Sequence, residues 1–460
     1  LYKPVAALSL AALTDVSCYY ISGLTKFPPR IFILSLLTLV SVPKIIGVYK
    51  SNPFVRKTIH ISVLIILTKC IADLNNSLSV VGIAKSVLAN HVIPIMIILC
   101  VCAHCHTVRA FKSLLGSIIG MTCFSGIVGI MQFHNFEPAW QLHKFLRSLM
   151  KESMMVEEII APSFWNIYSR ISGIALNPID FSYHLCSALG ILFPMVLILD
   201  LKTHHRRFLA LLAGILIIAS VESLTRSGIL GTAIIIVLSL YTKLRMGSHI
   251  RNQIVTWIPL ATLLIATITF AFQSLEGVST SNRVYSFVDP TRYSLYLGTI
   301  RMMSWYPFGV GSGLSLEAAA RHQTEFMDLP DPFAMSTLAV HNGFLLVGIT
   351  WGVLALFLMV YFYVHIFKFR NHLKQYAPNL PQNHELWGVI LPIWILGNLP
   401  NVLFHNASAF NGDIQFWYYI GIFLAVTNLV YAGSQADIAP KTSERPPLRR
   451  KFSTIPRAGS

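Results

Sequence analysis

Two arginines and one histidine are the residues of this sequence whose types and positions could do chemistry. Arg226 stands at the start of a long apolar run, Arg292 lies in a polar loop, and His341, followed by Asn342, stands at the start of another apolar run. An arginine keeps its charge and binds phosphate oxygens through a planar guanidinium. A histidine can accept a proton from a hydroxyl group near neutral pH. Such a set suits a lipid-linked diphosphate substrate and requires no metal ion.

Each of these residues alone also has a plain structural interpretation. Arg226 can extend its side chain to the membrane surface, Arg292 can be a solvated loop charge, and His341 can simply end a membrane span. Helical geometry indicates which neighbours can share a helix face with Arg292. At about 100° per residue, Tyr296 falls about 40° from Arg292 whereas Arg301 falls about 180° away. Only one of the two loop arginines can therefore face a given site.

The composition places these residues in a membrane protein. Of the 460 residues, 54% are hydrophobic and only 12% are charged, whereas soluble proteins carry about 25% charged residues. The net charge of +16 would suggest a nucleic-acid partner in a soluble protein, but cytoplasmic loops of membrane proteins collect Lys and Arg for an unrelated reason. We therefore expect membrane lipid, and no nucleic acid, as a partner.

Long apolar runs predict an all-α polytopic membrane protein with about 12 transmembrane helices, because a helix needs about 20 mostly apolar residues to cross a bilayer. The predicted spans are 5–22, 31–48, 58–74, 90–107, 113–132, 182–200, 207–222, 227–243, 254–272, 343–365, 386–404 and 414–432. The weakly apolar stretch 77–88 is predicted to be an interfacial or re-entrant piece. These spans form a single domain, 1–432. A basic tail, 433–460, is predicted to be disordered and drawn to anionic lipid.

The basic residues predict the orientation of these spans. If both termini are cytoplasmic, 22 of the 35 Lys and Arg residues fall in cytoplasmic segments, which agrees with the positive-inside rule. Two long loops, 133–181 and 273–342, then lie on the outer side, together with Arg226 and His341. Loops of this length are usually functional or disordered, and their tryptophans, prolines and helix-like stretches favour ordered, functional loops.

Two further groups of residues invite a chemical interpretation. Lys69 and Asp73 lie four residues apart inside a predicted span, so they can pair on one helix face or mark the pathway of a transporter. The stretch 100–109, CVCAHCHTVR, carries three cysteines and two histidines, but its spacing matches no zinc pattern. The simpler interpretation is a helix end with small apolar cysteines. We expect no metal site, no cofactor and no disulfide framework among the seven cysteines.

The sequence resembles the O-antigen ligase and O-antigen polymerase superfamily from about residue 172 to residue 362. The resemblance rests on SGIALNPIDFSYHL before the sixth predicted span, SLTRSG around Arg226, Arg292 fifteen residues before Pro307 with FGVGSGL after it, and the His341–Asn342 pair before a glycine-containing apolar helix. Two positions depart from the pattern. The family typically has Trp where this chain has Tyr296, and often an acid where it has Trp351.

This resemblance implies a C-type glycosyltransferase fold with a partly helical periplasmic loop, in the inner membrane of a Gram-negative bacterium, and an active site at the periplasmic face. Family members take a glycan from undecaprenyl diphosphate; ligases attach it to a sugar of lipid A-core, and polymerases join it to another repeat unit. The resemblance makes His341 the catalytic base and Arg226 and Arg292 the diphosphate ligands, with Asn342 and Tyr296 as supporting residues. The moderate loop sizes favour a ligase over a polymerase, and a solute transporter is the remaining alternative.

Overall fold

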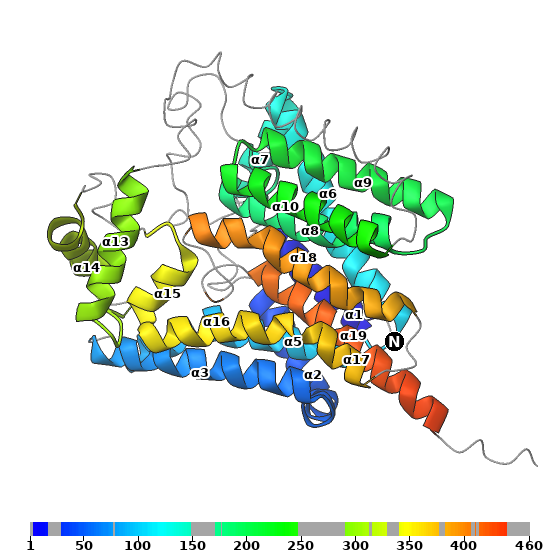
Figure 1. The fold of residues 1–460 in the computed structure, drawn as a ribbon, viewed down its shortest axis with the longest axis horizontal. Coiled ribbons are helices and arrows are strands. Elements are labelled where there is room, and N and C mark those ends of the chain that lie inside the picture. The colour runs from blue at the N-terminus through cyan, green and yellow to red at the C-terminus, as the bar shows by residue number, and fades with distance from the viewer. Residues whose placement is uncertain are drawn as a thin grey trace, which may run out of the picture.

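The computed structural model describes residues 3–16, 29–76, 79–148, 171–175, 177–246, 290–311, 315–328, 340–376, 382–405, 410 and 414–438. Every secondary-structure element in these residues is a helix (Figure 1). In chain order they are α1 (Lys3–Val16), α2 (Pro29–Ser51), α3 (Pro53–Asn75), α4 (Val80–Val87), the π-helical turn η1 (Leu88–Val92), α5 (Ile93–His104), α6 (Val108–Phe133), α7 (Glu137–Ser148), α8 (Pro178–Ile198), α9 (Thr203–Glu222), α10 (Arg226–Met246), α13 (Pro290–Trp305), α14 (Ser315–Arg321), the π-helical turn η5 (His322–Phe326), α15 (Gly343–Trp351), α16 (Val353–Phe367), α17 (Phe369–Tyr376), α18 (Gln382–Phe404) and α19 (Ile414–Ile438).

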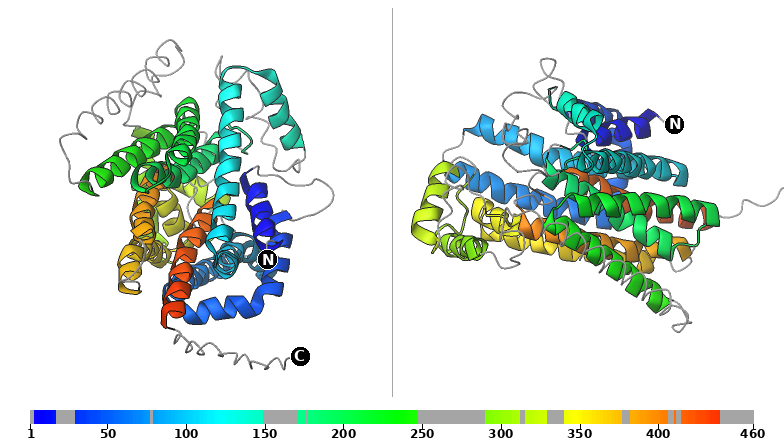
Figure 2. Two further views of the ribbon diagram at one scale, coloured as in Figure 1. Left: turned by 90° about the vertical axis from the view of Figure 1, so that its right-hand side faces the viewer. Right: turned by 90° about the horizontal axis from the view of Figure 1, so that it is seen from above.

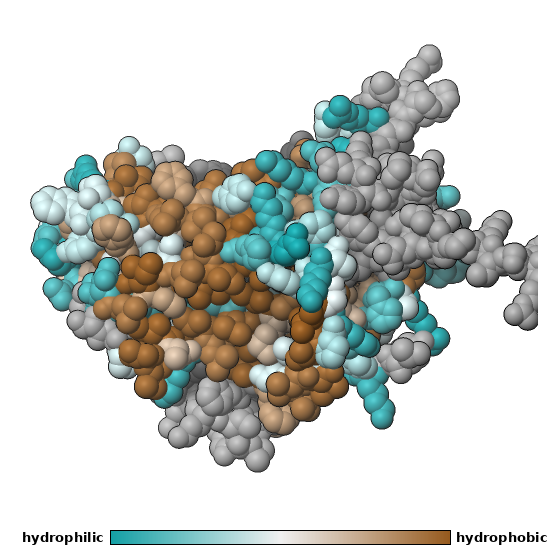
Figure 3. Space-filling model, turned by 90° about the horizontal axis from the view of Figure 1, so that it is seen from below, coloured by the Kyte–Doolittle hydropathy of each residue, from teal (hydrophilic) through white to brown (hydrophobic). Residues whose placement is uncertain are grey.

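Many of these helices have the length and composition of membrane spans. Helices α2, α6, α8, α9, α10 and α18 are long and apolar enough to cross a membrane, and α1, α5, α16 and α19 contain shorter apolar stretches. Large apolar side chains such as Leu39, Val40 and Phe357 are exposed. Seen from below, the surface carries a broad apolar band with hydrophilic margins (Figure 3). Soluble monomers rarely expose an apolar patch of that extent. The chain is therefore an all-helical membrane protein.

The helices overlap every predicted span except 254–272, which lies outside the described residues. In the stretch 77–88, predicted to be an interfacial or re-entrant piece, α4 begins at Val80 and continues through η1 into α5 without a gap. Pro94, which lacks an N–H group, explains the π-helical turn just before it, since the regular bond to residue 90 cannot form. The predicted disordered tail also begins too early, because α19 continues to Ile438. Residues 439–460 lie outside the described part.

The tenth predicted span, 343–365, is two helices and not one. The chain breaks at Gly352, which has a φ of 96°, and the loop 306–311 packs against this break. Three backbone hydrogen bonds of 2.9 Å join them: Val310 N to Ile349 O, Gly311 N to Thr350 O, and Val353 N to Pro307 O. Backbone groups released by the break thus remain paired, as a membrane interior requires. Residues 307–311 thus hold the loop against the span.

Gly309 and Gly352 are the positions where this packing requires glycine. A Cβ atom on Gly309 would lie 2.5 Å from Thr350 O, and one on Gly352 would lie 2.8 Å from Pro307 O. Both also have a positive φ, which strains an alanine. We expect Gly309→Ala or Gly352→Ala to lower the free energy of unfolding by about 1–3 kcal/mol, measured by thermal unfolding in detergent.

The control for this prediction is Gly47→Ala on α2. A Cβ atom at Gly47 meets nothing within 4 Å, and alanine is the better helix former. We expect the midpoint of thermal unfolding to stay the same or to rise in this variant. A loss at Gly47 as large as the loss at Gly352 would contradict the packing explanation.

Helices α8, α10 and α18 pack against one another. The backbones of α10 and α18 approach so closely that a Cβ atom on Gly231 would lie 2.3 Å from Gly397 O. Between α8 and α18, Ser187 Oγ donates to Asn398 Oδ1 at 2.9 Å and Tyr183 Oη donates to Asn401 O at 2.8 Å. Small residues and interhelical hydrogen bonds of this kind hold membrane helices together. The close approach at Gly231 places the first turns of α10 beside the last turns of α18.

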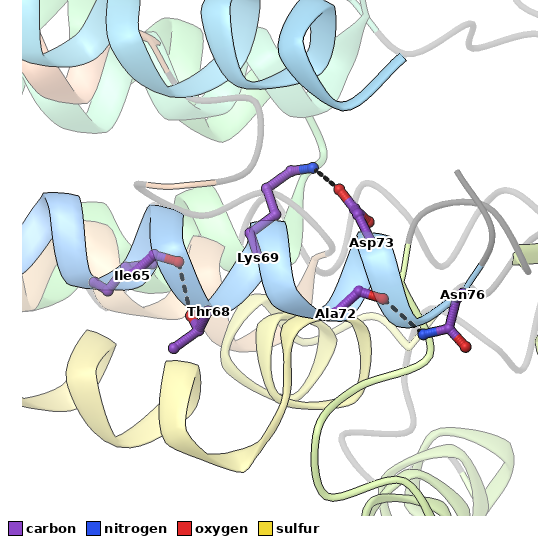
Figure 4. Close-up of polar contacts among 6 residues, drawn as sticks. All are labelled: Ile65, Thr68, Lys69, Ala72, Asp73 and Asn76. Carbon is purple, nitrogen blue, oxygen red and sulfur yellow. Dashed lines mark hydrogen bonds and ion pairs between the residues drawn. The ribbon is translucent and has the colours of Figure 1, made fainter. Parts of the chain in front are cut away.

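Lys69 and Asp73 form the ion pair that their spacing predicts, on one face of α3 (Figure 4). Both side chains are buried, with 3% and 0% of their surface exposed. Removal of one partner leaves a buried charge without its counter-ion, whereas replacement of both partners by apolar groups is often neutral. We expect Asp73→Leu alone to lower the free energy of unfolding by about 3–5 kcal/mol, measured by thermal unfolding in detergent.

The double variant Lys69→Met/Asp73→Leu tests the cause of that loss. We expect it to recover most of the stability that Asp73→Leu loses, since no charge is then left unpaired. An equal loss in the single and the double variant would show that the pair does not account for the effect.

The two ends of the molecule differ. Helices α13, α14 and α15 lie together at one end, which we call the α13 end, whereas α17 and the last turns of α19 lie toward the other (Figure 1). The view from above shows the same separation (Figure 2). Helix α3 runs from the opposite end toward the α13 end and packs against α15 and α16. Helices α13 and α14 thus lie at one end of the apolar bundle.

Candidate active site

Tyr296 connects three elements at the α13 end. Its hydroxyl oxygen on α13 lies 3.1 Å from the carbonyl oxygen of His341 and 3.1 Å from that of Leu403. His341 precedes α15, and Leu403 lies in the last turn of α18. The single hydroxyl proton is thus shared between two carbonyl groups from segments far apart in the sequence. This contact brings the loop helix, the histidine and the end of α18 together.

The backbone of His341 is held on both sides. Val340 before it is fully buried, and Asn342 after it caps α15 by accepting hydrogen bonds from Phe344 N and Leu345 N, each at 3.0 Å. His341 itself has a φ of 52°, a left-handed conformation that costs most residues about 1–2 kcal/mol. Its neighbours impose this conformation, while its side chain stays partly exposed. Strained residues held by their surroundings are typical of functional sites.

Arg226 is the first residue of α10 and is partly buried. The turn before it is tight: Leu224 has a φ of 52°, and Ser223 Oγ accepts a hydrogen bond from Thr225 N at 3.3 Å. After it, Ser227 Oγ lies 2.8 Å from His405 Nε2, at the end of α18. The position of Arg226 is therefore fixed by contacts on both sides of it in the sequence.

The two loop arginines have different surroundings. Arg292 lies on α13 one helical turn before Tyr296, so the two Cα atoms share a face of the helix; the side chain of Arg292 lies outside the described part. Arg301 is half-exposed and pairs with Asp328 at 2.8 Å, and this partner holds the pKa of the Asp328 carboxyl below its ordinary value. Tyr296 and Arg301 thus meet different partners, as the helical geometry predicts.

The last turn of α18 is the common neighbour of both candidate groups. The hydroxyl of Tyr296 contacts the carbonyl oxygens of both His341 and Leu403, so it links His341 to this turn. Ser227, the residue after Arg226, contacts His405 just beyond the turn. The structure thus places the start of α10 with Arg226, the segment with His341 and the helix that carries Arg292 around one helix end. Such an arrangement can bind an anionic leaving group beside a base.

His405 is the residue of this site that the sequence predictions missed. Besides its contact with Ser227, its ring lies 6.3 Å from the ring of Tyr183, measured between centroids. A signal was present, since His405 and Asn406 form a second His-Asn pair at the end of a predicted span. The hydrogen bond to Ser227 gives His405 the role of a positioning residue for the start of α10.

The described residues include the whole stretch 100–109, with its three cysteines and two histidines. No group of three or more His, Cys, Asp or Glu side chains in the described part of the chain could hold an ion. In the stretch 100–109, His104 Nε2 contacts Ser41 Oγ at 2.6 Å and Cys102 Sγ donates to Gly421 O at 3.8 Å, which are contacts between helices. Asp180, in the first turn of α8, accepts a hydrogen bond from Asn177 Nδ2 at 2.9 Å. These side chains have structural partners.

No family model and no curated protein matches this chain.

Proposed function

We propose that the protein is an inverting, metal-independent glycosyltransferase of the O-antigen ligase type, which moves a glycan from undecaprenyl diphosphate to a sugar hydroxyl of lipid A-core. The observation that carries the proposal is the contact of Tyr296 with both His341 and the end of α18, the same helix end that contacts the start of α10 beside Arg226. The resemblance of these segments to the O-antigen ligase and polymerase superfamily supplies the reaction.

The chemistry assigns one task to each group. The acceptor hydroxyl loses its proton to the imidazole of His341 while its oxygen attacks the anomeric carbon of the donor sugar from the side opposite the diphosphate. The bond between that carbon and the diphosphate oxygen breaks, and the configuration at the carbon inverts. Arg226 and Arg292 bind the diphosphate and stabilise the negative charge that builds up on it. Asn342 and Tyr296 hold the segment that carries His341.

The proposal includes the topology that the charges predict. It comprises about 12 spans in a C-type glycosyltransferase fold, both termini in the cytoplasm, and the α13 end at the periplasmic face of the inner membrane. In that orientation α13 and α14 belong to the periplasmic loop, where a lipid-linked donor and lipid A-core can both reach Arg226 and His341 from the membrane.

A lipopolysaccharide gel tests the proposed reaction in cells. Deletion of the gene for a ligase leaves lipid A-core without O-antigen, and complementation by the wild-type gene restores the ladder. A single capped repeat unit after deletion would instead indicate a polymerase. Unchanged lipopolysaccharide, together with reduced flux of a solute, would indicate a transporter and overturn the proposal.

A further inference from the structure

A cavity of about 380 Å³ lies at the end of the molecule opposite to the α13 end, between the first turn of α3 and the junction of α16 with α17. Its lining includes Phe54 and Lys57 from α3, His365 and Lys368 from this junction, and Asn371 and His372 from α17. None of these residues takes part in the proposed transfer reaction. In the proposed topology this end lies at the cytoplasmic face.

Aromatic stacking fixes the inner wall of the cavity. Phe54 is buried, and its ring lies 4.2 Å from that of His365 and 4.8 Å from that of His372, measured between centroids. Thr58 Oγ1 lies 3.2 Å from His365 Nε2 on the far side of the stack. The inner wall is therefore built from side chains that pack on one another, which favours a site over a chance gap between helices.

The charge of the cavity is positive. Lys57 and Lys368 line it, no acidic residue does, and neither lysine forms an ion pair with an acid among the described residues. Burial lowers the pKa of His372 to about 4, so this histidine is neutral at pH 7 and the charge comes from the lysines. With the amide of Asn371 beside them, the lysines offer donors to a compact anion.

Next to the cavity, α16 presents an apolar face to the membrane. Phe357, Tyr361 and Val364 are 66%, 42% and 43% exposed, and with Lys368 they follow one another at helical spacings of four, three and four residues. The ammonium group of Lys57 lies over the ring of Tyr361, 5.4 Å from its centroid. A basic cavity thus stands at the head of an apolar strip, which matches a molecule with an anionic head and a long apolar tail.

We propose that this cavity binds the phosphodiester headgroup of an anionic phospholipid, with its acyl chains along the exposed face of α16. Lys57, Lys368 and Asn371 contact the phosphate oxygens, and the stacked Phe54 and His365 form the back of the site. Basic pockets between helices at the cytoplasmic face are a known mode of lipid recognition. The site does not depend on the proposed transferase activity.

Native mass spectrometry of the purified full-length protein in detergent tests the site, by the fraction of protein with bound lipid during a titration with phosphatidylglycerol. We expect Lys57→Ala/Lys368→Ala to weaken binding by about 25-fold, or about 5-fold for each lysine. Phosphatidylcholine should bind weakly to both proteins. Inorganic phosphate in excess should not displace phosphatidylglycerol, because it lacks the chains that contact α16.

The matched control is Lys112→Ala/Arg207→Ala, which removes the same charge from two exposed positions outside the cavity. We expect this variant to bind phosphatidylglycerol like the wild type. Three outcomes would overturn the proposal: equal weakening in both double variants, unchanged binding in the cavity variant with a wild-type melting temperature, or displacement of the lipid by inorganic phosphate.

Discussion

Replacing His341 with asparagine is expected to lower the rate of glycan transfer by about 10²- to 10⁴-fold, the usual contribution of a general base. Asparagine is the informative substitute because it tolerates the left-handed backbone that His341 adopts, with a φ of 52°, yet cannot accept a proton as imidazole does. The rate is measured as transfer from an undecaprenyl-diphosphate-linked glycan to lipid A-core by the purified protein.

His341→Ala separates the chemical role from the structural one. We expect the same loss of transfer as in His341→Asn and, in addition, a loss of about 1 kcal/mol in the free energy of unfolding, since alanine does not favour this conformation. Asn342→Asp is the neighbouring control, because aspartate also caps helices, and it should keep most of the activity. Wild-type turnover in His341→Asn would remove His341 from the role of base.

Replacing Arg226 with alanine is expected to lower kcat by about 10²- to 10³-fold, comparable to the removal of one donor to a developing negative charge. Arg226→Lys should retain part of the rate, because lysine keeps the charge but loses the two-pronged contact with phosphate oxygens. Because the diphosphate gains charge as the glycosidic bond breaks, the loss should fall on kcat more than on KM. Steady-state kinetics with the lipid-linked donor measure both.

Arg301→Ala is the matched control for this prediction. Arg301 is half-exposed and paired with Asp328, and it meets partners other than those of Tyr296 on the same helix. We expect its loss to leave kcat within about two-fold of the wild type, as for a surface pair. If Arg301→Ala lowers kcat as much as Arg226→Ala, the assignment of the diphosphate ligands is wrong.

Most of the bundle could be predicted from the sequence because apolar length alone decides whether a segment can form a membrane helix. Among the described residues, helices overlap the predicted spans, although 343–365 forms two helices and several helix ends differ from the predicted bounds. The break at Gly352 could not be predicted in this way, since the apolar run 343–365 continues across it. The break is stabilised by hydrogen bonds to residues 306–311, more than forty residues away, and hydropathy carries no information on such contacts.

The candidate site also depends on contacts between distant residues, which the sequence pattern does not reveal. The types of Arg226 and His341 indicate the chemistry, and the helical wheel separates Tyr296 from Arg301. The hydrogen bonds that assemble the site join residues far apart in the sequence, such as Tyr296 to Leu403 and Ser227 to His405. No periodicity encodes these pairings. His405 was missed for that reason, although it stands at a span end like His341.

The most direct test of the central claim is glycan transfer by the purified protein in the presence of EDTA, with an undecaprenyl-diphosphate-linked glycan and lipid A-core as the only substrates. We expect the wild type to form glycosylated lipid A-core and to release one undecaprenyl diphosphate per glycan transferred, and we expect His341→Asn to form almost none. Transfer that requires a divalent ion, or that proceeds equally well in His341→Asn, would contradict the claim.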